Sequence, residues 1–225
     1  MLLDDTYKSI ATVREETDSA ILFLSLGKDS LVLLDLIYPK FERIVCVFMY
    51  FVPGLEHIER WVKWTKAKYP KIELIQIPHW NLTYILRGGL YCVPNPKVKL
   101  LKLADVVKSM RLKYGIDYVF LGMKKADSMN RRLMLNRMRF PYESKGLVYS
   151  LADWTQRDIL AYMRQKGLPE PVRYSKNASG GIGLNLECFL WMRENSPNDL
   201  EKIFAVFPMS KRILFEYDNK KDGTK

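Results

Sequence analysis

The sequence has few cysteines, few histidines and no long hydrophobic run. Its three cysteines, Cys46, Cys92 and Cys188, are an odd number and stand far apart, so a disulfide framework is not expected. The longest apolar runs, residues 20–24 and 43–52, have the length of strands and are too short to cross a bilayer. No signal-like segment precedes the first cysteine. These absences predict a cytoplasmic protein in a reducing compartment, without membrane contact.

Acidic residues are also scarce. Lys and Arg number 36 against 25 Asp and Glu, which leaves a formal net charge of +11. Such a surplus favours an anionic partner, which could be a nucleotide, a nucleic acid or an acidic protein. With 48% hydrophobic and 27% charged residues, the composition excludes a disordered or fibrous chain. A chain of 225 residues is long enough for one large domain, or for one domain with a small appendage.

Short apolar runs alternate with helical patterns over the first two thirds of the chain. Strands are expected at residues 20–24, 43–49, 72–77, 117–121 and 147–151. Helices are expected at about residues 31–38, 55–68, 100–114 and 155–165. Strands that are apolar throughout are typical of parallel sheets covered on both faces. The predicted fold class is therefore α/β, an open, doubly wound, mostly parallel five-stranded sheet.

The pattern changes beyond Gly167, where three helices are expected at about residues 185–193, 198–206 and 210–217. We expect residues 1–166 to form the α/β domain, residues 167–218 a helical C-terminal cap packed on it, and residues 219–225 a frayed tail. Within the first domain, residues 78–96 are rich in Gly, Pro and aromatics and are predicted to be irregular, a candidate lid. Cys92 lies in this segment and is expected to be the exposed cysteine.

The loop after the first predicted strand reads Ser25-Leu26-Gly27-Lys28-Asp29-Ser30. A turn between a strand and a helix offers unpaired backbone N–H groups, and Ser25, Gly27, Lys28 and Ser30 add hydroxyls, close approach and positive charge, all of which suit a phosphate. Asp29 beside phosphates calls for Mg²⁺ or another cation between them. The alternative is structural: Asp29 or Ser30 caps the helix, and Lys28 is a solvated lysine.

This loop resembles the PP-loop, Ser-Gly-Gly-x-Asp-Ser, of the adenine nucleotide alpha hydrolase-like superfamily, which includes ATP pyrophosphatases and phosphoadenosine phosphosulfate (PAPS) reductases. Leu26 stands where the superfamily has glycine. The resemblance implies the fold already expected from the pattern. It also implies that Ser25, Gly27, Lys28, Asp29 and Ser30 bind the phosphate or sulfate groups of an adenine nucleotide, with Asp29 as a candidate Mg²⁺ ligand.

A second stretch, residues 122–131, is similar to the PAPS reductase pattern Gly-x-Arg-x-x-Glu-Ser-x-x-Arg, with Lys124 for the first Arg and Asp for Glu. It follows the fourth predicted strand, so it is expected at the sheet edge that carries the first loop. The resemblance implies that Gly122, Lys124 and Ser128 bind the nucleotide and that Lys124 and Arg131 close on its anionic end. The alternative is a solvated basic segment, because Arg131, Arg132, Arg137 and Arg139 crowd there.

Two further stretches extend the resemblance to about residues 20–208. Residues 149–162 are similar to the family's Pro-Leu-x-x-Trp-x-x-x-Asp signature, in which Trp154 and Tyr162 are expected to be packing residues. Residues 181–188 resemble the family's C-terminal Gly-Cys-x-x-Cys stretch, which in some members holds an iron–sulfur cluster. Only Cys188 is present here, so no cluster is expected. Cys46 and Cys188 are both expected to be buried.

The resemblance allows two chemistries. An ATP pyrophosphatase-type enzyme binds ATP together with Mg²⁺ for adenylyl or sulfur transfer. A sulfonucleotide reductase, which uses PAPS or adenylyl sulfate (APS), instead needs a reactive thiol. We favour the first, with Lys28, Asp29, Lys124 and Arg131 as catalytic candidates, because no cysteine stands in the C-terminal tail. The reductase, with Cys92 or Cys188 as nucleophile, is the alternative.

A third hypothesis is a non-catalytic nucleotide-binding or nucleic-acid-binding partner protein. Family members from phages and plasmids operate in DNA modification or with a nuclease-like partner protein, which the resemblance permits here. Together the hypotheses cover transferase and oxidoreductase chemistry in sulfur metabolism, and they allow the chain to act as a homodimer.

Overall fold

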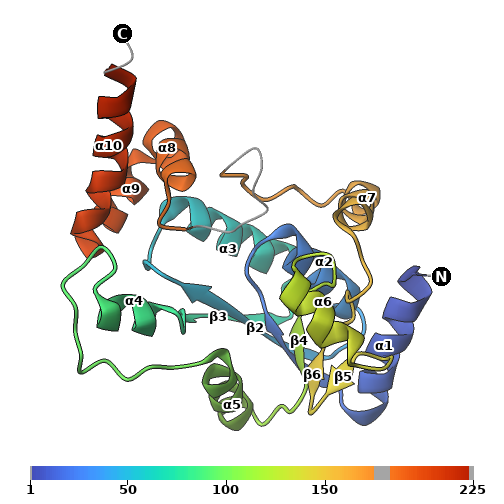
Figure 1. The fold of residues 1–225 in the computed structure, drawn as a ribbon. Helices are drawn as coiled ribbons and strands as arrows, with labels where there is room; N and C mark the ends of the chain where they lie inside the picture. The colour runs from blue at the N-terminus through green and yellow to red at the C-terminus, as the bar shows by residue number, and fades with distance from the viewer. Residues whose placement is uncertain (1, 175–182, 223–225) are drawn as a thin grey trace. The chain divides into compact units, whose positions relative to one another are not determined.

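The computed structural model describes residues 2–174 and 183–222 (Figure 1). The chain divides into two compact units that interleave along the sequence. The first comprises residues 1–49, 65–77 and 104–171, and the second residues 50–64, 78–103 and 172–225. The domain boundaries expected from the sequence, after residues 166 and 218, stay a prediction.

A six-stranded sheet is the centre of the first unit, in the order β3-β2-β1-β4-β6-β5. The pairs β1–β2, β1–β4 and β4–β6 are parallel, and only the edge pair β5–β6 is antiparallel. The strands are β1 (Ser19–Phe23), β2 (Arg43–Tyr50), β3 (Ile72–Pro78), β4 (Val119–Leu121), β5 (Glu143–Ser144) and β6 (Leu147–Val148). The predicted α/β class with a mostly parallel sheet is confirmed. The predicted strand count of five was wrong. The sixth strand, β5, has only two residues, both polar, so no apolar run in the sequence marks it.

The apolar runs of the sequence form the inner strands of the sheet, which are buried on both faces. In β1, Ala20, Ile21 and Leu22 are fully buried, and Val119 and Phe120 of the neighbouring β4 are as well. A strand with sheet neighbours on both sides and helices on both faces has no polar face, so its sequence does not alternate.

The helices of the first unit are α1 (Leu2–Glu16), α2 (Lys28–Ile37), α5 (Leu103–Tyr114), α6 (Met129–Asn136) and α7 (Gln156–Lys166), while α3 (Glu56–Lys68) contributes residues to both units. Asp35 of α2 accepts hydrogen bonds from the hydroxyls of Tyr69 and Tyr162, each at 2.8 Å. This carboxylate ties α2 to α7, and the phenols it binds keep raised pKa values because of burial and its charge.

Trp154 and Tyr162 are packing residues, as expected. The indole Nε1 of Trp154 donates to Thr6 Oγ1 of α1 at 2.8 Å, and its ring meets that of Tyr162 edge-on. Thr155 and Asp158 then form a capping box that starts α7. This part of the family-like signature therefore stabilises the fold.

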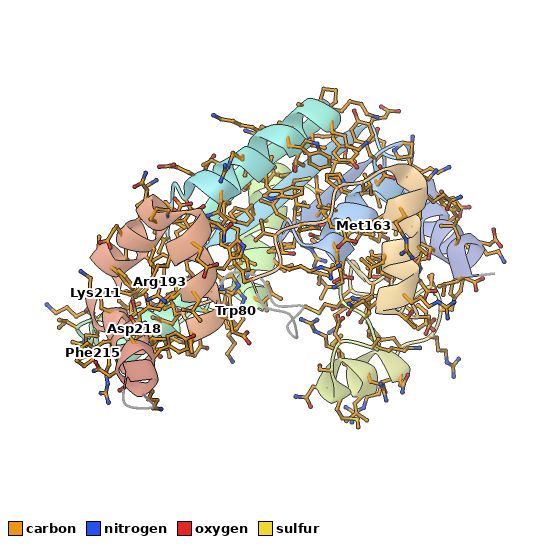
Figure 2. The ribbon with its side chains drawn as sticks, turned by 90° about the horizontal axis from the view of Figure 1, so that it is seen from above. Trp80, Met163, Arg193, Lys211, Phe215 and Asp218 are labelled. Atoms are coloured by element: carbon orange, nitrogen blue, oxygen red, sulfur yellow. The ribbon has the colours of Figure 1, made fainter. Side chains whose placement is uncertain are left out.

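The second unit is helical and contains α4 (Leu82–Gly88), α8 (Leu186–Asn195), α9 (Pro197–Val206), the short 3₁₀ helix η1 (Pro208–Ser210) and α10 (Lys211–Asp222). Its core includes the fully buried Phe189, Met192 and Phe207. On its surface, Arg193 of α8 binds Asp218 of α10 at 3.0 Å (Figure 2). Helices expected at the C-terminal end are thus present, and α10 runs to Asp222, into the stretch expected to be frayed.

Asp199 of α9 is buried and organises the start of α3. Its carboxylate accepts hydrogen bonds from the backbone N–H groups of Glu56 and His57 and lies 2.6 Å from the Nδ1 of His57. Burial lowers the pKa of His57 in spite of this carboxylate. A neutral imidazole donates from Nδ1 to Asp199 and accepts at Nε2 from the hydroxyl of Tyr174, 2.7 Å away.

The structure also bears on the expectations for residues 78–96, for Cys92 and for the C-terminal stretches. Residues 78–96 are not wholly irregular, because they contain α4; their function as a lid stays a prediction. Cys92 is buried, with 8% exposure, so the expectation of an exposed thiol was wrong: its side chain packs in the core of the second unit. Gly181 and Ile182, which begin the family-like stretch before Cys188, and tail residues 223–225 lie outside the described residues.

Within residues 2–174 and 183–222, we find no helix with the length and apolar character that a membrane crossing requires.

Replacing Asp199 by Ala leaves two first-turn amides and the imidazole of α3 without their buried acceptor. We expect a loss of about 3 kcal/mol in the free energy of unfolding, measured by urea titration. Asp218→Ala is the matched control, since its ion pair with Arg193 is exposed and is worth less than about 1 kcal/mol. Equal effects of the two substitutions would contradict the capping role of Asp199.

Candidate nucleotide-binding site

The candidate site lies where the strand order reverses. β1 pairs with β2 on one side and with β4 on the other, both in parallel, and Phe23 at the end of β1 stands beside Leu121 at the end of β4. The segments that follow the two strands therefore leave the same edge of the sheet. In open α/β sheets this switch point is the usual place for a ligand.

The N-terminus of α2 is arranged to accept an anion. The helix begins at Lys28 with Gly27 as its N-cap residue, and among the described residues no side chain caps it. The N–H groups of Lys28, Asp29 and Ser30 belong to the first turn and so have no partner within the helix. The alternative in which Asp29 or Ser30 caps the helix is therefore wrong. The uncapped amides and the helix dipole favour a negative group at this end.

Serine hydroxyls hold the loop in shape. The hydroxyls of Ser25 and Ser30 are 3.1 Å apart, and the Ser30 hydroxyl donates to the carbonyl of Gly27 at 3.0 Å. The N–H of Gly27 donates to Ser25 Oγ at 3.3 Å. Ser25 is exposed, while Gly27, Lys28 and Asp29 are partly exposed, so the loop is open to solvent. These internal hydrogen bonds fix the shape of a loop that is open to solvent.

Leu26 carries the loop's backbone strain. Its φ of +58° lies in the left-handed region, which a leucine rarely adopts and a glycine adopts freely. The glycine of the PP-loop pattern at this position thus has a conformational reason, and this chain keeps the conformation without the glycine. Its side chain is buried, with 5% exposure, and that apolar burial offsets the strain.

Asp29 connects the loop to the segment after β4. Its Oδ2 lies 3.1 Å from Lys28 Nζ, and its Oδ1 lies 2.7 Å from Lys124 Nζ. Lys124 is almost fully buried, with 1% exposure. The contact is a close and largely buried ion pair. The attraction of opposite charges therefore carries this link.

Lys124 also binds Asp127, three residues further along. Its Nζ is 2.7 Å from Asp127 Oδ1, while Asp127 Oδ2 accepts from the Lys124 backbone N–H at 2.9 Å and from Arg131 at 2.6 Å. Burial favours the neutral form of Asp127, but these donors and charges outweigh it, so the pKa of Asp127 lies below its usual value. An unbroken row of alternating charges results, from Lys28 through Asp29, Lys124 and Asp127 to Arg131.

Gly122 lies where the two segments meet. A Cβ at this position would be in van der Waals contact, at 3.4 Å, with backbone atoms of Asp29 and Ser30. The glycine that opens the second family-like stretch thus lies against the first turn of α2.

The structure brings together most of the residues singled out in the sequence. Those around the first turn of α2 are Ser25, Gly27, Lys28, Asp29, Ser30, Gly122 and Lys124. Ser128 instead caps α6, its hydroxyl accepting from the Arg131 N–H, and Arg131 connects to the loop only through Asp127. Asp127 was not among the predicted site residues. Its signal was present, since it occupies the acidic position of the second pattern.

The donor chemistry suits one carboxylate ligand for Mg²⁺. Both oxygens of Asp29 and both oxygens of Asp127 face cations, but among the described residues Oδ2 of Asp29 is paired with one group alone, the ammonium of the partly exposed Lys28. Mg²⁺ that binds with a nucleotide takes one or two carboxylates together with phosphate oxygens, and Asp29 fits that pattern. The described residues contain no cluster of three or more His, Cys, Asp or Glu able to hold a metal on their own.

All three cysteines are buried. Burial raises the pKa of Cys46 and of Cys188, so both stay protonated at neutral pH. The Sγ of Cys188 also accepts from the N–H of Gly183 at 3.4 Å. The predicted burial of Cys46 and Cys188 is confirmed.

A family model described as the phosphoadenosine phosphosulfate reductase domain matches residues 19–177, which is most of the chain. The chain belongs to this family. The resemblance read from the PP-loop and the second stretch is thereby confirmed, and both lie inside the matched region. Membership places the chain in a family of nucleotide-binding enzymes.

Among solved structures, the chain is similar to a PAPS reductase from Candida auris in complex with phosphate, at 15% identity and a TM-score of 0.43, over 67% of this chain and 74% of that one. It is also similar to an NH3-dependent NAD synthetase from Campylobacter jejuni subsp. jejuni in complex with nitrate, at 15% identity and a TM-score of 0.46, over 96% and 94%. No curated protein sequence matches significantly.

Because the backbone at Leu26 is strained, replacing it by glycine should destabilise the protein less than replacing it by alanine. Leu26→Ala loses the apolar burial and keeps the strained backbone, whereas Leu26→Gly loses the burial and relieves the strain. We expect the glycine variant to be the more stable by about 1 kcal/mol, although glycine is ordinarily the less stable of the two. Thermal and urea unfolding measure the difference, and the ordinary order would contradict the left-handed conformation.

The lowered pKa of Asp127 predicts a stability that depends on pH. Its contribution is fully present above the unfolded-state pKa of about 3.9 and is lost as the pH falls through the lower folded-state value. Asp127→Asn should therefore reduce stability at neutral pH and flatten the decline below about pH 4. Urea titrations from pH 2 to 7 test this. Asp5→Asn, at an exposed carboxyl of α1, should leave the profile unchanged, and an unchanged profile in Asp127→Asn would refute the assignment.

Proposed function

We propose that the chain is an ATP-binding enzyme that cleaves the nucleotide between its α and β phosphates, in adenylyl or sulfur-transfer chemistry. The observation that carries the proposal is the uncapped first turn of α2, with Lys28 and Asp29 at its start and two serine hydroxyls holding the loop. The family membership supports a nucleotide as the ligand.

In this proposal the amides of Lys28, Asp29 and Ser30 bind phosphate oxygens at the helix N-terminus. Lys28 leaves Asp29 and binds the phosphates directly, because a phosphate carries more charge than the carboxylate it replaces. Asp29 is then free to hold Mg²⁺, which neutralises phosphate charge when bound. Lys124 stays in place behind the loop and keeps the carboxylate of Asp29 oriented.

The transfer itself needs few protein groups. An acceptor nucleophile forms a bond to the α-phosphorus, the bond to the bridging α–β oxygen breaks, and pyrophosphate leaves with the electron pair. Fixed amides and ammonium groups stabilise the negative charge that develops on the phosphate oxygens. In this proposal the amides need not move when the nucleotide binds, whereas Lys28 exchanges its contact with Asp29 for one with phosphate.

The sulfonucleotide reductase remains the alternative, since the family takes its name from that activity. That chemistry needs a thiolate that reaches the sulfur of the bound substrate. Three buried cysteines argue against it. Calorimetry with ATP, APS and PAPS separates the two: tight PAPS binding together with thioredoxin-dependent sulfite release would overturn the ATP proposal, and so would loss of activity on thiol alkylation of the folded protein.

Lys28→Ala should weaken ATP binding by about 1.5–3 kcal/mol, which is roughly 10- to 150-fold, because it removes a charge-assisted contact to phosphate. Calorimetry measures the dissociation constant. Lys108→Ala is the matched control, because it removes the same charge from an exposed position on α5. Equal affinities of the two variants would refute the role of Lys28.

A further inference from the structure

Helix α6 and the turn after it are unusually exposed. In residues 129–140 the side chain of Leu135 is fully buried, whereas Met129, Leu133 and Phe140 are 64%, 52% and 49% exposed. Met134 is exposed as well. A short helix that leaves this much apolar surface in water has a face without a partner in its own unit. Figure 1 shows α6 and the following segment leading to β5 and β6.

The same segment is strongly basic. Residues 128–142 contain four arginines, Arg131, Arg132, Arg137 and Arg139, and no Asp, Glu or Lys. Arg131 is neutralised by Asp127, while the Nε of Arg132 donates to the carbonyl of Lys125. In the part of the chain that the structure describes, Arg132, Arg137 and Arg139 form no ion pair. Three guanidinium groups on one short segment therefore lack a counter-charge.

The chemistry of this surface fits a single-stranded nucleic acid. All its cations are arginines, whose planar guanidinium binds phosphate through two parallel hydrogen bonds and also stacks on bases. The exposed ring of Phe140, edge-on to Tyr142, offers a stacking surface beside them. Cations that follow the backbone, with apolar and aromatic groups for unpaired bases, are what single strands require.

We propose that residues 129–140 form a docking surface for single-stranded RNA or DNA. The surface begins next to the candidate nucleotide site, because α6 starts directly after Ser128 and Asp127, which binds Lys124. A strand docked there would hold its bases or its end close to the first turn of α2. If the proposed ATP chemistry holds, the strand is the acceptor of the activated group; only that last role rests on the proposed function.

The test is fluorescence anisotropy with a labelled 20-nucleotide strand over a series of salt concentrations. The variant Arg132→Gln/Arg137→Gln/Arg139→Gln should bind at least about tenfold more weakly, and the slope of log affinity against log salt should fall by about 2, for three lost phosphate contacts. The matched control Arg157→Gln/Arg164→Gln/Lys166→Gln removes the same charge from exposed positions on α7 and should stay close to the unmodified protein. Equal loss in both variants would overturn the proposal.

A second variant separates stacking from charge. Phe140→Ala should weaken binding about tenfold without changing the salt slope, because stacking releases no counterions. Should the triple variant fail to fold, the single variants Arg137→Gln and Arg139→Gln replace it, since neither side chain has an ion pair with another described residue. Binding to vesicles rich in anionic lipid but not to either strand would contradict the proposal, as would binding to neither.

ATP calorimetry on the same proteins distinguishes this inference from the proposed function. The triple variant should bind ATP as the unmodified protein does. One outcome is that the strand binds, that the arginine substitutions abolish its binding, and that ATP does not bind. In that case the docking surface stands without the ATP chemistry. If ATP binds and the strand does not, the docking surface is refuted and the ATP chemistry stands.

Discussion

The ammonium of Lys124, buried between the carboxylates of Asp29 and Asp127, is the interaction on which the candidate site depends. It joins the loop after β1 to the segment after β4, two parts of the chain about a hundred residues apart. Charges buried away from water attract one another strongly when they are paired. Removing one partner destabilises the fold, because it leaves the other charge buried and unpaired. The link therefore fixes the position of Asp29 before any nucleotide arrives.

The contacts of Lys124 add to the prediction made for it from the sequence, which stays a prediction. A lysine in the place of the family's arginine was expected to close on the anionic end of a nucleotide, but its Nζ already faces two carboxylates. Lys28 is different, because it is partly exposed and, among the described residues, is paired with Asp29 alone. We propose that the two lysines have different tasks: Lys124 positions the carboxylate of Asp29, and Lys28 exchanges Asp29 for phosphate.

Much of the fold could be predicted because the sheet is parallel and buried on both faces. Such strands, as in residues 20–24 and 43–49, are visible as unbroken apolar runs. Helices α1, α4 and α6 and strand β5 were missed. Two of them have weak signals, since β5 has two residues and α6 buries Leu135 and little else. Cys92 was misplaced because a loop rich in Gly and Pro does not reveal that it packs into a core.

The candidate site was predictable to the extent that its motifs are local. Ser25 to Ser30 form one turn, and its position after β1 follows from the chain itself. The partner of Asp29 could not be read from the sequence, because it depends on β4 lying next to β1, which a pattern of runs does not specify. The strain at Leu26 was hidden for another reason, since a backbone angle is visible only in three dimensions.

The most direct measurement of the central claim is a titration of isotopically labelled protein with ATP, followed by the backbone amide signals. The account predicts that the amides of Gly27, Lys28, Asp29 and Ser30 shift most, and that Gly122 shifts with them. Signals that move elsewhere while these amides stay still would contradict it.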